Sequence, residues 1–249
     1  MTSDFSSSAS VAVNPAEPVY RAYAALASVS PLDVEAGLGG KLLFAGEIKE
    51  RSRELLFAAN IAGAASLAAS ADPGSLRLAI RDGVIDFSVT SLEEALRILK
   101  NEIRKRQPVS VGVAVDSRVL VEQMADRGVL PDLLPPLELA ATFLRQGARE
   151  VVHPVDQVGE FVSWSVDREF NRWLPRLDAC VQAIVPENDY LRLRWLRLAP
   201  RYLGRLARRQ HGVVLSMEEV TQFRAKAADM FQQHTDANAR IEINGQLLA

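Results

Sequence analysis

The chain of 249 residues is poor in cysteine, histidine and aromatic residues, and it has no long apolar run. Its single cysteine, Cys180, excludes an internal disulfide and a cysteine-rich metal site, and it fits the reducing cytoplasm, where we expect the protein. His211 and His234 lie far apart without ligand spacing, so we expect no metal site. No segment approaches the roughly 20 uninterrupted apolar residues that a membrane-spanning helix needs, so we expect no membrane span.

The chain also lacks an excess of either charge, because it has 29 Lys and Arg residues and 31 Asp and Glu residues. The net charge of −2 and the pI of about 6.0 disfavour a dedicated nucleic-acid binder but leave room for a local basic patch. Residues 1–18 lack the basic region and the continuous apolar stretch of a secretory signal. We expect them to form a disordered tail.

Between residues 19 and 156, short apolar runs alternate with amphipathic helical patterns. This alternation is typical of an α/β fold with a doubly wound, mostly parallel, Rossmann-like sheet. Strands are predicted at 41–45, 65–69, 84–89 and 109–115, with 131–134 and 150–154 as candidates for two more. Because a helix is predicted in each connection, the sheet should be parallel with right-handed crossovers.

The pattern changes after residue 156, where helical periodicity dominates. Helices are predicted at 160–185, at 188–209 with a break near Pro200, and at 216–233, followed by a terminal strand at 239–243. We therefore expect residues 157–249 to form a helical annex packed on the core rather than a tethered domain.

Several short motifs stand in order along residues 61–132. They are Ile61-Ala62-Gly63-Ala64 with Ser66-Leu67, Asp72-Pro73, Ser91-Leu92-Glu93-Glu94-Ala95-Leu96, Ser110-Val111-Gly112, and Arg127-Gly128-Val129 with Pro131-Asp132. In this order and with nearly gapless spacing, they resemble the nucleotide-binding domain of urocanase over less than half of the chain. The resemblance implies a urocanase-like fold. Urocanases add water to urocanate and use a tightly bound NAD⁺ as the electrophile.

The residues that the resemblance implies for NAD binding and catalysis depart from the pattern of that family. Urocanases have a loop of the form GLGGMGGAQ around the pyrophosphate, whereas residues 47–55 here begin with the acidic Glu47. Ser70 stands where an acidic residue would bind the ribose, and Val115-Asp116 replaces a Gly-Asn turn. The cysteine-containing catalytic segment and the TDQTSAHDP-like run have no counterpart. We therefore expect a pseudoenzyme that neither binds NAD nor hydrates urocanate, and we expect no other cofactor.

Polar residues follow several of the predicted strands, and ligands of parallel sheets bind beyond the carboxyl ends of the strands. The catalytic candidates are Glu47, Asp116 and His153, and the candidates for a ligand pocket are Ser70, Asp72, Thr90, Ser117 and Asp156. The alternative interpretation is that Asp72, Thr90 and Ser117 cap helices. His153 with Asp156 could form an oriented general base, or His153 could be structural.

The sharpest local charge feature is an amphipathic segment at 192–209 that is rich in arginine and has no acidic residue. Its candidates for anion binding are Arg192, Arg194, Arg197, Arg201 and Arg205. Such a segment suits phosphate, nucleic acid, an anionic membrane surface or an acidic partner. The alternative is that the arginines pair with acidic helices and pack their stems on aromatic residues.

We therefore expect a protein with a urocanase-like fold and without urocanase activity. Its expected role is to bind a ligand or to interact with another protein, and it could form a homodimer through the apolar annex. The alternative is a NAD-independent enzyme that acts on a small molecule at the strand ends. A second alternative is the binding of an anion or of nucleic acid through residues 192–209, although the near-neutral net charge disfavours nucleic acid.

Overall fold

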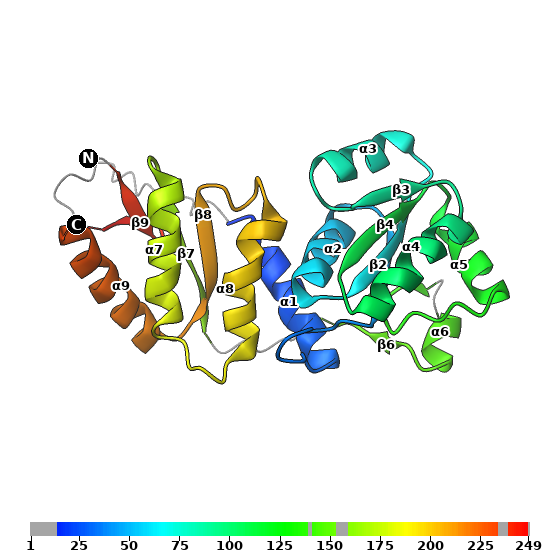
Figure 1. The fold of residues 1–249 in the computed structure, drawn as a ribbon, viewed down its shortest axis with the longest axis horizontal. Coiled ribbons are helices and arrows are strands. Elements are labelled where there is room, and N and C mark those ends of the chain that lie inside the picture. The colour runs from blue at the N-terminus through cyan, green and yellow to red at the C-terminus, as the bar shows by residue number, and fades with distance from the viewer. Residues whose placement is uncertain (1–13, 139–140, 153–158, 234–238, 249) are drawn as a thin grey trace, which may run out of the picture.

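The computed structural model describes residues 14–138, 141–152, 159–233 and 239–248. They form two lobes that lie side by side, a Rossmann-like lobe with a six-stranded sheet and a C-terminal lobe with a four-stranded sheet (Figure 1). Helix α1 (Ala16–Val29) lies between them. In the described ranges, no helix is long and apolar enough to cross a membrane.

The larger sheet is parallel and has the strand order β3-β4-β2-β1-β5-β6. Its strands are β1 (Leu42–Glu47), β2 (Ala65–Ala69), β3 (Phe87–Val89), β4 (Val109–Val113), β5 (Leu133–Leu134) and β6 (Arg149–Glu150). β2 and β4 are buried at every residue, which explains why their sequences are unbroken runs of apolar and small residues. The predicted parallel sheet is confirmed.

Helices cover both faces of this sheet, because consecutive side chains of a strand point to opposite faces. Leu43 and Ala45 of β1 share a core with α1, α2 (Glu50–Ala62) and α3 (Pro73–Arg81). Leu42 and Phe44 share a second core with α4 (Leu92–Lys105), α5 (Ser117–Asp126) and α6 (Ala141–Arg145). The doubly wound arrangement is thus confirmed.

The C-terminal lobe contains an antiparallel sheet of order β10-β9-β7-β8 as well as helices. Its elements are β7 (Glu160–Val166), α7 (Phe170–Gln182), α8 (Tyr190–Leu203), β8 (Gln210–Leu215), α9 (Met217–Gln232), β9 (Ile241–Ile243) and β10 (Gln246–Leu247). The predicted helix at 160–185 is therefore wrong in its first part. Val162, Trp164 and Val166 are buried at every second position, and this period of two is that of a strand.

Helix α8 continues through Pro200, so the predicted break at that residue is wrong. Pro200 lies in the last turn, where its ring removes only the N–H that would reach the carbonyl of Leu196. Only three residues of the helix follow it, and the helix ends before Gly204.

Residues of the predicted N-terminal tail belong to the fold, because α1 begins at Ala16 rather than at residue 19. The Oδ1 atom of the buried Asn14 accepts a hydrogen bond from the Ala16 N–H at 2.8 Å and so starts the helix. From there α1 packs on α2 in one lobe and on α8 and β8 in the other. Helix α1 therefore joins the two lobes.

Candidate functional site

The point where the strand order reverses lies at β1, which has β2 on one side and β5 on the other. In doubly wound sheets, ligands bind beyond the carboxyl ends of the strands at this point. Glu47 at the end of β1 is in register with Ala69 of β2, which is in register with Val113 of β4. The residues that follow these three positions therefore share one edge of the sheet.

The connection from β1 to α2 is only two residues long, Ile48 and Lys49. Ser52 closes it, because its hydroxyl accepts from the Lys49 N–H at 2.6 Å and lies 2.6 Å from the carbonyl oxygen of Glu47. Ile48 and Ser52 are buried. The start of α2 is therefore packed by its own side chains, without a glycine-rich loop.

Leu137, which follows β5, covers the end of β1. Gly46 has a φ of +76°, and a Cβ atom at this position would lie 3.1 Å from Cδ1 of Leu137. Leu137 follows β5 and packs against the core that contains Phe44 and Leu134. Leu137 thus occupies the space above the junction of β1 and β5.

Four of the predicted site residues meet at the carboxyl edge. Burial raises the pKa of the Glu47 carboxyl, and the negative charge of Asp116 raises it further. Hydrogen bonds from the Ser70 hydroxyl and from the backbone N–H of Ser117 act in the opposite direction, as does the charge of Lys49. Glu47, Ser70, Asp116 and Ser117 therefore form one polar group, the carboxyl-edge cluster, in which the charge of Asp116 acts on the carboxyl of Glu47.

Other predicted residues of this edge serve as helix caps. Asp72 accepts from the backbone N–H groups of Gly74 and Ser75, both at 2.9 Å, and these bonds lower its pKa. Thr90 is not itself a cap, because Ser91 caps α4; Thr90 donates from its backbone N–H and its hydroxyl to the carboxylate of Glu94. Asp116 also caps α5 by accepting from the Arg118 N–H at 2.8 Å. His153 and Asp156 lie outside the described residues.

The arginines of residues 192–209 divide into two groups. Arg192 forms ion pairs with Asp189 at 2.6 Å and with Glu219 at 2.7 Å. Arg194 is buried and donates to the carbonyl oxygens of Ile61 and Glu35. The guanidinium groups of Arg192 and Arg194 are therefore engaged within the chain.

The other three candidates of that segment, Arg197, Arg201 and Arg205, are exposed. Among the described residues, none of the three has an acidic partner within 4.0 Å. Arg201 lies over the ring of Tyr202, 5.4 Å from its centroid. These three side chains remain free to meet an anion.

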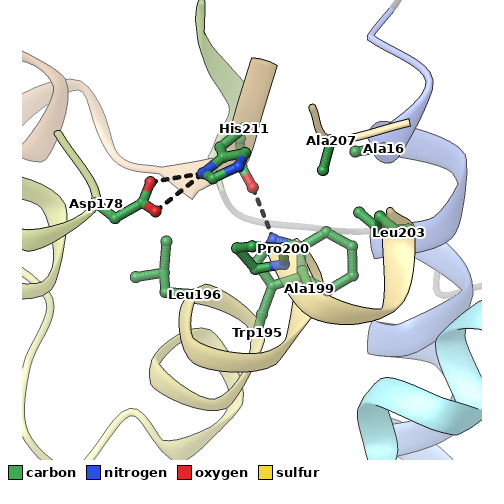
Figure 2. A pocket seen from close by; sticks show the side chains of 10 residues that line it. Ala16, Asp178, Trp195, Leu196, Ala199, Pro200, Leu203, Ala207 and His211 are labelled. Atoms are coloured by element: carbon green, nitrogen blue, oxygen red, sulfur yellow. Dashed lines mark hydrogen bonds and ion pairs between the residues drawn. The ribbon is translucent and has the colours of Figure 1, made fainter. Parts of the chain in front are cut away.

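Sequence reasoning missed one buried polar pair in the C-terminal lobe. Figure 2 shows Nδ1 of His211 on β8, which lies 2.9 Å from both carboxylate oxygens of Asp178 on α7. Trp164 Nε1 donates to the same carboxylate at 3.0 Å. The cavity beside the pair measures about 10 Å³, which is the space of one water molecule. The pair is thus suited to joining α7 to the sheet rather than to admitting a substrate.

No metal centre accompanies these residues. Within the described part of the chain, no group of three or more His, Cys, Asp or Glu side chains could hold a metal ion.

A parallel sheet of this order, with helices on both faces and polar residues at its carboxyl edge, defines a Rossmann-like α/β domain. Residues 20–136 match the family model of the urocanase Rossmann-like domain. This part of the chain is therefore similar to the urocanase Rossmann-like domain, and the resemblance inferred from the motifs is confirmed. The whole of the antiparallel sheet lies outside the matched range.

Proposed function

We propose that the chain is a binding protein that uses a urocanase-like scaffold without a dinucleotide and takes a positively charged ligand at the carboxyl-edge cluster. The observation that carries this proposal is the meeting of two carboxylates, Glu47 and Asp116, near the place where a Rossmann domain holds a pyrophosphate. Two carboxylates repel a pyrophosphate and attract an amine, whose charge stabilises both in their ionised form.

Further features support the absence of NAD. A pyrophosphate needs close approach to backbone N–H groups at the start of the first helix, and Ser52 fills that position here. Leu137 covers the end of β1 beside Gly46. Ser70, which is almost fully buried, supplies no carboxylate for the ribose hydroxyls. The residues present at this edge do not fit a dinucleotide.

The proposal is tested by titrating the full chain with putrescine, a simple diamine, and following backbone amide signals by NMR. We expect saturable shifts at Ser70 and Ser117 that disappear in the double variant Glu47→Gln, Asp116→Asn. The matched control is Glu94→Gln, since Glu94 is an exposed carboxylate in the first turn of a different helix. Shifts of equal size in the double variant, or none in the wild type, contradict the proposal.

The raised pKa of Glu47 favours a second candidate, a NAD-independent enzyme that transfers a proton at the same edge. The wild-type protein and Glu47→Gln would each be incubated with a mixture of small metabolites and analysed by mass spectrometry. A product formed by the wild type and not by Glu47→Gln supports an enzyme. Identical profiles support binding alone.

The exposed guanidinium groups of Arg197, Arg201 and Arg205 support the proposal of an additional anionic partner. Such binding rests on charge, so its affinity should fall steeply with salt and should be lost in the triple alanine variant. Binding of heparin that is insensitive to salt contradicts it.

The proposal also includes a homodimer that forms through the C-terminal lobe and a location in the reducing cytoplasm. It is supported by the exposure of Tyr190, Met217 and Leu247, of which Met217 is 75% exposed, and by the single cysteine. Light scattering across a concentration series tests the dimer. A monomeric mass at every concentration contradicts it.

A further inference from the structure

A cleft of about 450 Å³ lies between the two lobes and shares no lining residue with the carboxyl-edge cluster. Its volume falls in the range of about 300 to 1,000 Å³ that is typical of small-ligand sites, and such sites favour the boundaries between structural units. The cleft is lined by Pro15, Pro18, Val19, Glu50, Arg53, Glu54, Phe57, Asp82, Leu203, Arg205 and Leu206. Helices α1, α2 and α8, which contribute most of its walls, lie next to one another in Figure 1.

The floor of the cleft is apolar and rigid. Val19, Phe57 and Leu203 are almost fully buried, and each belongs to the core that the two lobes share. Leu206, at the edge, is 37% exposed. An apolar group placed here would remove that surface from water, which favours binding.

The rim of the cleft carries opposite charges on opposite lobes. Glu50 stands on α2 in the Rossmann-like lobe, and Arg205 follows α8 in the C-terminal lobe. Arg53 forms an ion pair of 2.7 Å with Asp82, whose carboxylate also pairs with Arg81 at 3.2 Å. The rim therefore offers a ligand the acidic group of Glu50 on the Rossmann-like side and the basic group of Arg205 on the other.

We propose that this cleft binds a short apolar peptide with free termini, its ammonium group toward Glu50 and its carboxylate toward Arg205. The apolar floor matches the side chains, and the opposed charges match a zwitterion rather than an anion or a cation alone. A guanidinium group suits a carboxylate because its donors form a planar fork. This inference is independent of the function proposed for the carboxyl-edge cluster.

The cleft combines residues inside and outside the family match. Glu50 and Phe57 lie within residues 20–136, whereas Leu203, Arg205 and Leu206 belong to the segment beyond it. The site therefore depends on the docking of the C-terminal lobe onto the Rossmann-like domain, and it is a feature of this chain rather than of the matched domain.

The test is isothermal titration calorimetry of the full chain with tri-leucine at pH 7. The matched ligand is N-acetyl-tri-leucine amide, which has the same side chains and neither charge. We expect tri-leucine to bind at least about tenfold more tightly than the capped peptide, a difference of one decade in Kd. Equal affinity for the two peptides, or no binding of tri-leucine, overturns the proposal.

Variants of the rim locate the binding. Arg205→Ala should weaken tri-leucine binding about tenfold, and Glu50→Gln should weaken it by a similar factor. Arg208→Ala is the control, because Arg208 is an exposed arginine of the same segment that does not line the cleft. All three positions are exposed, and thermal unfolding verifies that each variant is folded. Unchanged tri-leucine binding in Arg205→Ala, or an equal loss in Arg208→Ala, also overturns the proposal.

Discussion

The guanidinium group of Arg194 on α8 donates through Nε to the carbonyl oxygen of Ile61, near the end of α2, at 2.8 Å. A second nitrogen of the same group donates to the carbonyl oxygen of Glu35 at 2.9 Å. Arg194 is buried, so these bonds connect the C-terminal lobe to two segments of the Rossmann-like lobe without exposure to water. The two lobes are therefore expected to unfold together.

Arg194→Ala should lower the free energy of unfolding by about 1 to 3 kcal/mol, because it leaves the buried carbonyl group of Ile61 and the carbonyl group of Glu35 without their charged donor. The measurement is urea unfolding followed by circular dichroism. The exposed Arg197→Ala is the matched control and should change the free energy by less than about 0.5 kcal/mol. Equal effects of the two substitutions would contradict the role assigned to Arg194.

Asp178→Ala should lower the free energy of unfolding by about 1 to 3 kcal/mol, because it removes the acceptor of both His211 and Trp164. In a double-mutant cycle, Asp178→Ala and His211→Ala should show a coupling of at least about 0.5 kcal/mol. Gln182→Ala, an exposed change on the same helix, serves as the control. Strictly additive effects of the two substitutions would show that the pair does not act as a unit.

Gly46→Ala should destabilise the protein by about 1 to 2 kcal/mol, because alanine is strained in the left-handed backbone conformation of this position. The contact of the new Cβ atom with Leu137 should add about 1 kcal/mol. Gly83→Ala isolates the backbone effect, because Gly83 has a φ of +74° and no atom within 4 Å of a built Cβ. Urea unfolding of both variants, with and without Leu137→Ala, measures the difference. The excess at Gly46 should disappear when Leu137 is shortened, and its persistence would contradict the position of Leu137 over β1.

Glu47 gives a prediction for the pH dependence of stability. Its pKa is raised in the folded protein, so between the unfolded and the folded pKa the folded state binds more protons and stability falls as the pH rises. Glu47→Gln should therefore be more stable than the wild type at pH 7, with the difference diminishing as the pH falls below the unfolded pKa. Urea unfolding at pH 4 and pH 7 checks this.

Glu94→Gln is a control that should change the stability at pH 7 in the opposite direction. Hydrogen bonds from Thr90 lower the pKa of Glu94, so its ionised form stabilises the folded state above the unfolded pKa. This variant should be less stable than the wild type at pH 7, with the difference lost as the pH falls through the folded pKa. The same sign for both variants would show that burial and the charge of Asp116 do not raise the pKa of Glu47.

Much of the Rossmann-like lobe could be predicted because its central strands are buried on both faces. Residues 65–69 and 109–113 are unbroken runs of apolar and small residues between amphipathic helices, and this pattern has few other interpretations. The carboxyl-edge cluster followed from the same logic. The carboxyl ends of parallel strands meet, so Glu47, Ser70 and Asp116 had to approach one another.

The C-terminal lobe was harder to predict because its strands lie close to helices in sequence. β7 alternates in only seven residues and is followed almost at once by the helical period of α7. Without β7 and β8, nothing in the sequence brings His211 to Asp178, which lies 33 residues away. The burial of Arg194 was also hidden, since its position in an arginine-rich helix is typical of a solvated face.

The most direct test of the central claim is native mass spectrometry of the full chain, purified without added cofactor and then titrated with NAD⁺. The carboxylates of Glu47 and Asp116, the closed start of α2 and the position of Leu137 predict the mass of the unliganded chain and no uptake of NAD⁺. A retained NAD molecule, or saturable uptake during the titration, would contradict the account and indicate a working dinucleotide site.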